Sequence, residues 1–186
     1  MEEPRFVRSS RLRMGEDRSV WRLQKYSDQE MANQNTAFHL PADTGPCYCG
    51  PGDRYTFLVT GAQSNGGYFI MEATIPPGGG PPLHIHHREE ECLYLLEACW
   101  TSRWAKKGQA TTGDFVQIPR GTVHAFFNAG NTTARMLLFF SPAGMDKYFE
   151  EVLEPVQKRS ASIPTVTEAL IARMVGAGPK HGIEFV

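Results

Sequence analysis

The sequence predicts an all-β fold, a sandwich or barrel of many short strands, followed by a helical tail. Short apolar, β-branched and aromatic runs recur from residue 55 onward, about ten residues apart, with turn residues between most of them. Beyond residue 142 the periodicity becomes helical. The 186 residues suffice for one domain with arms. We expect a flexible extension over residues 1–30, a barrel with an N-terminal arm over 31–142, and a tail over 143–186 that packs on the barrel.

The composition is that of a soluble globular protein, with 41% hydrophobic and 21% charged residues. A formal net charge of -1 provides no field for nucleic acid or an anionic membrane, and no apolar run approaches the ~18 residues of a membrane span. The N-terminus is charged where a signal peptide is apolar. We therefore expect a cytoplasmic protein that binds neither nucleic acid nor membranes, with four reduced thiols at Cys47, Cys49, Cys92 and Cys99.

Residues 1–30 differ from the rest because they are rich in arginine and show no clean apolar period. Acidic residues offset much of the positive charge. We interpret this segment as a solvated extension. A basic arm, or a natural start at Met31, are the alternatives.

The strand region contains one loop and one turn with clear signatures. The Pro- and Gly-rich segment 76–82 must be a loop, because neither a helix nor a central strand tolerates it. A type I turn is expected over 118–121, with Pro at its second position and Gly at its fourth. The predicted strands are residues 55–59, 68–75, 92–97, 99–105, 115–118, 123–127 and 135–140.

The tail is predicted to contain two helices. Residues 145–153 carry apolar side chains at helical spacing and end before Pro155. The second helix begins with a capping box, Thr165 with Glu168, and stops near Gly176. Its apolar face comprises Val166, Leu170 and Met174. Met174 and three residues of the first helix form a lid on the barrel mouth, or else the helices pack outside or on a partner subunit; these three are Met145, Tyr148 and Phe149.

Three of the six histidines lie within four residues, next to three consecutive glutamates. Residues two apart in a strand share a face, so His84 and His86 point the same way. Glu91 cannot share that face on one uninterrupted strand. The charged stretch 87–90 offers a reversal, after which Glu91 begins an antiparallel strand and faces back toward the histidines.

A fourth group comes from the predicted strand 123–127. If the face of His124 is the barrel interior, His124 can join the other three side chains. Three neutral imidazoles and one carboxylate bind a divalent first-row metal and leave positions open for water, dioxygen or substrate. Iron, manganese, nickel, cobalt and copper all fit, and zinc is possible, at one divalent transition metal per chain. The predicted metal ligands are His84, His86, Glu91 and His124.

The neighbouring residues are interpreted as having no part in the site. His87, Glu89 and Glu90 are expected in a solvated turn, although Glu90 replaces Glu91 if the register slips by one. Cys92 points away from the site if its strand is regular. Several apolar side chains are either pocket walls or simply core: Tyr68, Phe126, Met136, Phe139 and Phe140.

These residues resemble the two motifs of the cupin superfamily. The first motif, G-x5-H-x-H-x4-E-x6-G, fits Gly78, His84, His86 and Glu91, with Ala98 in place of its last glycine. The second, G-x5-P-x-G-x2-H-x3-N, fits at Gly113, Pro119, Gly121, His124 and Asn128. The resemblance implies a cupin fold, which is a double-stranded β-helix or jelly-roll barrel, and a homodimer.

The runs 81–89 and 113–126 look most like the bacterial quercetin 2,3-dioxygenase-like group of single-barrel cupins. That resemblance implies a metal-dependent dioxygenase that cleaves a flavonol or another enol- or phenol-bearing small molecule with dioxygen. Glu91 would then also be the catalytic base that takes the substrate hydroxyl proton. A non-catalytic binding or sensor module and a metal-dependent isomerase are the alternatives. The isomerase would need an acid/base pair beyond Glu91, and the sequence reveals none.

Overall fold

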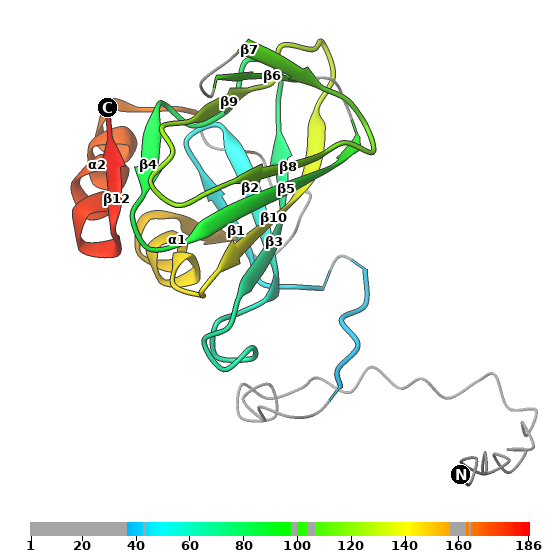
Figure 1. The fold of residues 1–186 in the computed structure, drawn as a ribbon, viewed down its shortest axis with the longest axis vertical. Coiled ribbons are helices and arrows are strands. Elements are labelled where there is room, and N and C mark those ends of the chain that lie inside the picture. Colours follow the sequence, from blue (N-terminus) through cyan, green and yellow to red (C-terminus); the bar gives the residue numbers. More distant parts are fainter. Residues whose placement is uncertain (1–36, 43, 98–99, 104–106, 157–162, 164) are drawn as a thin grey trace, which may run out of the picture. The chain divides into compact units, whose positions relative to one another are not determined.

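The computed structural model describes residues 37–42, 44–97, 100–103, 107–156, 163 and 165–186 (Figure 1). The expected extension over residues 1–30 and the substituted motif position Ala98 lie outside them. Within the described residues the chain forms twelve strands and two helices. The all-β prediction with a helical tail is therefore confirmed.

The larger sheet has seven antiparallel strands in the order β11-β1-β2-β3-β10-β5-β8. Along β10, buried and half-buried residues alternate, because one face of the sheet covers the core. The strands are β1 (Cys47–Gly50), β2 (Asp53–Val59), β3 (Phe69–Ile75), β5 (Glu90–Glu97), β8 (Phe115–Ile118), β10 (Ala134–Ser141) and β11 (Glu154–Val156).

The other strands form two small antiparallel sheets. A single bridge between His84 and His124 joins them into a second wall of the barrel. One sheet pairs β4 (His84–His86) with β12 (Ile183–Phe185), and the other has the order β7-β6-β9, with β6 (Trp100–Arg103), β7 (Lys107–Ala110) and β9 (Ala125–Phe127). Figure 1 shows β12 beside β4, so the end of the chain closes this wall. The sequence did not predict β1, β7, β11 or β12.

The core lies inside the large sheet and continues onto the first helix. Phe57 and Phe69 meet edge to face with ring centroids 4.8 Å apart, and Phe69 stacks on Phe140 at 5.9 Å. All three rings are buried. Burying one such ring contributes roughly 1.5–3 kcal/mol relative to leaving it exposed. The strand prediction depended on these residues, so its success has a direct energetic basis.

Helix α1 (Met145–Val152) is confirmed as predicted, and it ends before Pro155. Its apolar face is fully used, because the five residues at helical spacing are all buried: Met145, Tyr148, Phe149, Val152 and Leu153. A helix with one apolar stripe packs that stripe on the core. The helix thereby extends the barrel interior rather than standing apart from it.

Helix α2 (Glu168–His181) differs from its prediction at both ends. The cap is Thr167, whose side chain accepts a hydrogen bond from the Leu170 N–H, so the capping box at Thr165 is wrong. The helix also continues through Gly176 and ends at Gly182, which has the left-handed φ of 78° typical of a helix end. Packing on α1 holds the extra turns, since His181 Nε2 lies 2.9 Å from Glu151 Oε2 of that helix.

The turn before His124 also differs from its prediction. The Thr122 N–H donates to the Pro119 carbonyl at 3.1 Å, so the turn spans 119–122 rather than 118–121. Gly121 is then the third residue, and its φ of 80° is the one that a type II turn requires there. The type I prediction is therefore wrong by one residue and by type, although the turn exists where it was expected.

Two expectations about the whole chain have partial outcomes. Cys47, Cys49 and Cys92 are free thiols, whereas Cys99 lies outside the described residues. Among the helices that the structure describes, none has the length and hydropathy needed to cross a bilayer.

Candidate metal centre

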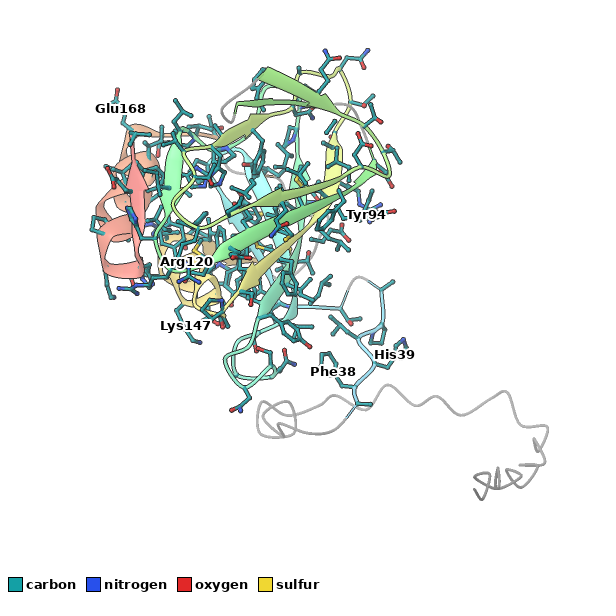
Figure 2. All side chains as sticks on the ribbon, viewed as in Figure 1. Phe38, His39, Tyr94, Arg120, Lys147 and Glu168 are labelled. Carbon is teal, nitrogen blue, oxygen red and sulfur yellow. The ribbon has the colours of Figure 1, made fainter. Side chains whose placement is uncertain are left out.

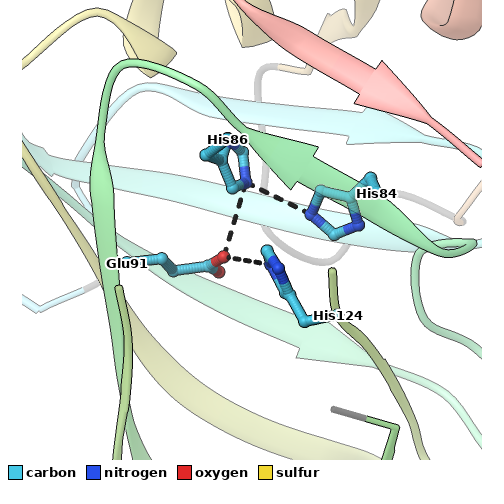
Figure 3. Close-up of side chains that lie close together, drawn as sticks. All are labelled: His84, His86, Glu91 and His124. Carbon is cyan, nitrogen blue, oxygen red and sulfur yellow. Dashed lines mark hydrogen bonds and ion pairs between the residues drawn. The ribbon is translucent and has the colours of Figure 1, made fainter. Parts of the chain in front are cut away.

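The four predicted ligands converge at one place (Figure 3). The His84 and His86 Nε2 atoms are 3.2 Å apart, and the Glu91 Oε2 atom lies 3.4 Å from His86 Nε2 and 2.9 Å from His124 Nε2. One donor atom from each residue lies within 4.8 Å of all the others. All four side chains are buried.

The two walls of the barrel supply these residues together. His84 and His86 alternate with half-buried Ile85 on β4, as the strand period requires. Glu91 belongs to β5 of the large sheet. The backbone groups of His84 and His124 exchange two hydrogen bonds, at 2.9 and 3.0 Å, which hold the second motif against the first. The predicted shared interior face is thus confirmed.

Hydrogen bonds at the far side of two imidazole rings orient them. His84 Nδ1 lies 2.8 Å from the Pro82 carbonyl, and His124 Nδ1 lies 2.8 Å from the Thr122 carbonyl. A carbonyl oxygen only accepts, so each Nδ1 carries a proton and donates it to its carbonyl, which directs the Nε2 atom of each ring inward toward the other donor atoms. His86 Nδ1 has no partner among the described residues.

The electrostatics of the cluster follow from burial and from the pairing with Glu91. Burial would raise the pKa of the Glu91 carboxyl, but the hydrogen bonds of His124 and His86 hold it well below its usual range. Burial acts to lower the pKa of His124, yet the bond to Glu91 raises it overall. Burial, together with the charge of His124, lowers the pKa of His84 to about 4, so His84 is a neutral donor at physiological pH.

This donor set fits a divalent first-row metal ion. With a metal bound, three neutral imidazoles and one carboxylate would add a charge of -1, and their donor atoms all lie within 4.8 Å of one another. A cation with two positive charges satisfies lone pairs that would otherwise repel each other. The fit depends on the chemistry of the side chains and on their convergence.

The centre opens into a cavity of about 630 Å³. His84, His86 and Glu91 lie on its wall, and the loop 76–82 forms another part. Most of the remaining lining is apolar or aromatic, as is typical of small-molecule sites. A ligand in this cavity would therefore meet the metal centre from an apolar environment.

The predicted pocket residues divide into two groups. Phe126 and Phe140 line the cavity, whereas Met136 belongs to the core. Tyr68 and Phe139 stack on each other with ring centroids 5.5 Å apart, and neither lines the cavity. The four lid residues of the tail all line the cavity as well: Met145, Tyr148, Phe149 and Met174. Both helices of the tail therefore supply part of the cavity wall, and a lid on the barrel mouth stays a prediction.

One prediction about the segment 87–90 is wrong. Glu89 is only 2% exposed rather than solvated, and its Oε2 atom has no hydrogen-bond partner among the described residues. The Glu89 side chain packs against Gly144, since a Cβ atom at position 144 would lie 2.7 Å from Glu89 Oε1. Burial raises the pKa of this carboxyl. By contrast, His87 and Glu90 are exposed as predicted, and His87 Nε2 lies 2.8 Å from Glu184.

Sequence reasoning missed one polar residue of the cavity, Asp53. It begins β2, lines the cavity and is 4% exposed. Its neighbour two residues on, Tyr55, lies on the same face and also lines the cavity. No motif marked Asp53, and it lies two residues before the predicted strand 55–59 begins.

Comparison with known proteins agrees with this geometry. Residues 71–140 match the family described as the cupin domain. A germin-like protein 3-7 of Oryza sativa subsp. japonica is 31% identical over 85 residues, which are 40% of this chain and 35% of the relative. The quercetin 2,3-dioxygenase of Bacillus subtilis (strain 168) is 26% identical over 110 residues, 57% of this chain and 32% of the relative. The chain therefore spans about a third of the length of these two relatives.

A solved structure supports the fold in particular. The crystal structure of a RmlC-like cupin from Shewanella frigidimarina NCIMB 400 has a TM-score of 0.52 and 21% identity, covering 61% of this chain and 97% of that one. The barrel of this protein is a cupin fold with a helical tail. Its site is a four-residue His/Glu group that could hold a metal ion.

Proposed function

We propose that this protein is a metal-dependent dioxygenase that acts on an enol- or phenol-bearing small molecule of the flavonol type. The convergence of His84, His86, Glu91 and His124 carries the proposal, since the first three of them line a largely apolar cavity. Likeness to a quercetin 2,3-dioxygenase over 57% of the chain supports the reaction class.

In this proposal the four residues hold one divalent transition metal: iron, manganese, nickel, cobalt or copper, with zinc also compatible with the ligands. When bound, such a metal supplies a Lewis acid and, if it is redox-active, a place for dioxygen. Glu91 Oε2 takes the proton of the substrate hydroxyl, since the carboxyl is ionised and faces the cavity. The neutral His84 and the paired His124 keep their rings fixed through their Nδ1 bonds.

The cavity supports an aromatic substrate of moderate size. A volume of about 630 Å³ lies within the range of small-molecule sites and would hold one flavonol rather than a polymer. Phe126, Phe140 and Phe149 provide aromatic walls. Water exclusion by these walls would protect a reactive, deprotonated substrate.

The test is dioxygen uptake by protein loaded separately with each candidate metal. With quercetin we expect uptake that requires metal, matches quercetin loss and disappears in Glu91→Gln. His87→Gln is the matched control, because His87 is exposed and pairs with Glu184 instead of the centre. Binding of quercetin without uptake would favour a non-catalytic binding module. Failure to bind any metal would overturn the proposal.

We propose a homodimer as well, and a cytoplasmic location stays a prediction. Tyr94 and Phe115 are paired across β5 and β8, and both are exposed large apolar side chains. Figure 2 shows Tyr94 projecting from the outer side of the barrel. Exposed apolar neighbours of this kind favour self-association. Light scattering measures the molar mass in solution, which should be that of a dimer for the wild type and lower for Phe115→Lys.

A further inference from the structure

The wall of the cavity carries a second polar group of residues, formed by Asp53 and Tyr55 of β2. The Tyr55 hydroxyl donates to Asp53 Oδ2 at 3.2 Å, and Asp53 Oδ1 has no hydrogen-bond partner among the described residues. Both side chains are buried, and both line the cavity. The Tyr55 ring packs on Phe149 of α1 with centroids 5.2 Å apart, which holds the hydroxyl in place.

A loop fixed by backbone hydrogen bonds covers Asp53. The loop 76–82 covers it, since a Cβ atom at Gly79 would lie 2.8 Å from Asp53 Oδ1. That loop is fixed by two backbone bonds with Asn128, from the Gly78 N–H to the Asn128 carbonyl and from the Asn128 N–H to the Gly79 carbonyl, both at 2.9 Å. A glycine at position 79 is therefore what allows the carboxyl to sit beneath the loop.

Burial raises the pKa of Asp53 to about 7, despite the hydrogen bond from Tyr55. The groups that titrate around this pair are Tyr148 of α1 and Glu91 of β5, which both act on Tyr55, while the loop 76–82 carries none. Burial and the charge of Asp53 raise the pKa of Tyr55, so its hydroxyl keeps the proton. The proton of a neutral Asp53 then resides on Oδ1, which becomes a donor without an acceptor.

We propose that Asp53 is a substrate-binding residue that donates a hydrogen bond from its carboxyl group to an oxygen of the substrate, and that Tyr55 positions it. Asp53 lines the cavity, and because Oδ2 already accepts from Tyr55, Oδ1 is the oxygen left to donate to a ligand there. The substrate class is an aromatic molecule with oxygens at two separate places, one for the metal centre and one for Asp53. This rests on the proposed function only in placing the substrate in the same cavity.

The experiment compares two probes on nickel-loaded protein without dioxygen, so that no turnover occurs. 3-Hydroxyflavone has only its adjacent enol and carbonyl oxygens, whereas quercetin also has hydroxyls on its outer rings. We expect Asp53→Leu to weaken quercetin binding about five- to tenfold and to leave 3-hydroxyflavone binding unchanged. Asp53→Asn should restore quercetin binding, because its amide both accepts from Tyr55 and donates to the ligand.

A pH series separates binding from a structural role. In the wild type, the preference for quercetin should fall as pH rises through about 7, where Asp53 loses its proton. In Asp53→Asn the preference for quercetin should not fall in this way. Titration of quercetin itself affects both proteins equally, so it cancels in the comparison. Equal loss of both probes in Asp53→Leu, an unchanged preference, or no binding of quercetin would overturn the inference. Metal content, measured on the same samples, tests the proposed function separately.

Discussion

Glu91 and Asp53 are two carboxyl groups buried in one cavity, and their surroundings move their pKa values in opposite directions. Histidines on two sides hold the pKa of Glu91 far below its usual range. Asp53 has a single hydroxyl as partner, so burial raises its pKa to about 7. A carboxylate that stays charged suits a cation, whereas a carboxyl that keeps its proton can donate to an uncharged oxygen.

This difference shows how buried carboxyls acquire distinct roles within a single pocket. Desolvation acts on both, and the count of nearby donors decides which one ionises. The same difference explains why one was predictable. Glu91 belongs to a motif with defined spacing, whereas Asp53 has no recognisable pattern around it.

The largest expected effect is loss of metal from the four-residue centre that contains Glu91. His124→Ala should lower metal affinity by more than about a hundredfold, since even outer partners of metal ligands contribute 10–100-fold. Metal per chain, measured by mass spectrometry after dialysis, should fall to background. His87→Ala, which changes the exposed residue directly after β4, should keep its metal. Equal metal content in the two variants would remove the distinction between the two carboxyl sites.

The next largest effect concerns Asp53 and is a change of the free energy of unfolding with pH. The folded-state pKa is raised, so the native state holds the proton longer and wild-type stability falls as pH rises from about 4 to about 7. Asp53→Asn lacks this loss. Its free energy of unfolding relative to wild type should therefore rise by as much as about 4 kcal/mol over that range.

Urea unfolding of metal-free protein at several pH values measures this change. Titration of the histidines and of Glu91 is shared by both proteins, so it cancels in the comparison. A difference between wild type and Asp53→Asn that stays constant with pH would mean that Asp53 ionises normally in the folded protein.

A smaller effect is expected when the loop above Asp53 is crowded. In Gly79→Ala the new methyl group would lie 2.8 Å from Asp53 Oδ1 and 2.9 Å from Ile75 Cγ2. Overpacking of this kind costs about 1–3 kcal/mol of stability. Metal content should be unchanged, because the three heavy atoms nearest to the new methyl group belong to Asp53, Ile75 and Pro76 and to none of the four ligands.

The smallest effect has the opposite sign and serves as the matched control. Gly176→Ala lies inside α2 with no heavy atom within 4 Å of the new Cβ. Alanine is favoured over glycine in a helix by about 1 kcal/mol, so this variant should be slightly more stable. Thermal unfolding of both alanine variants compares them directly. Destabilisation of equal size in both would show that the crowding above Asp53 is not the cause.

The common face of His84 and His86 was predictable because its geometry is local. A strand period of two places His84 and His86 on one face, and the turn before His124 returns the chain to them. Glu89 could not be placed in this way. Its side chain lies in a reversal that has no period, and its burial depends on Gly144, far along the chain.

The sequence by itself determined the strand-rich barrel, the apolar face of α1 and the shared face of His84 and His86, because each follows from the period of a strand or helix. Only the tertiary structure decided that Asp53 is buried beneath Gly79, that β12 pairs with β4, and that α2 continues past Gly176. These features arise from contacts between distant segments, and packing outweighs local propensity wherever such contacts are made.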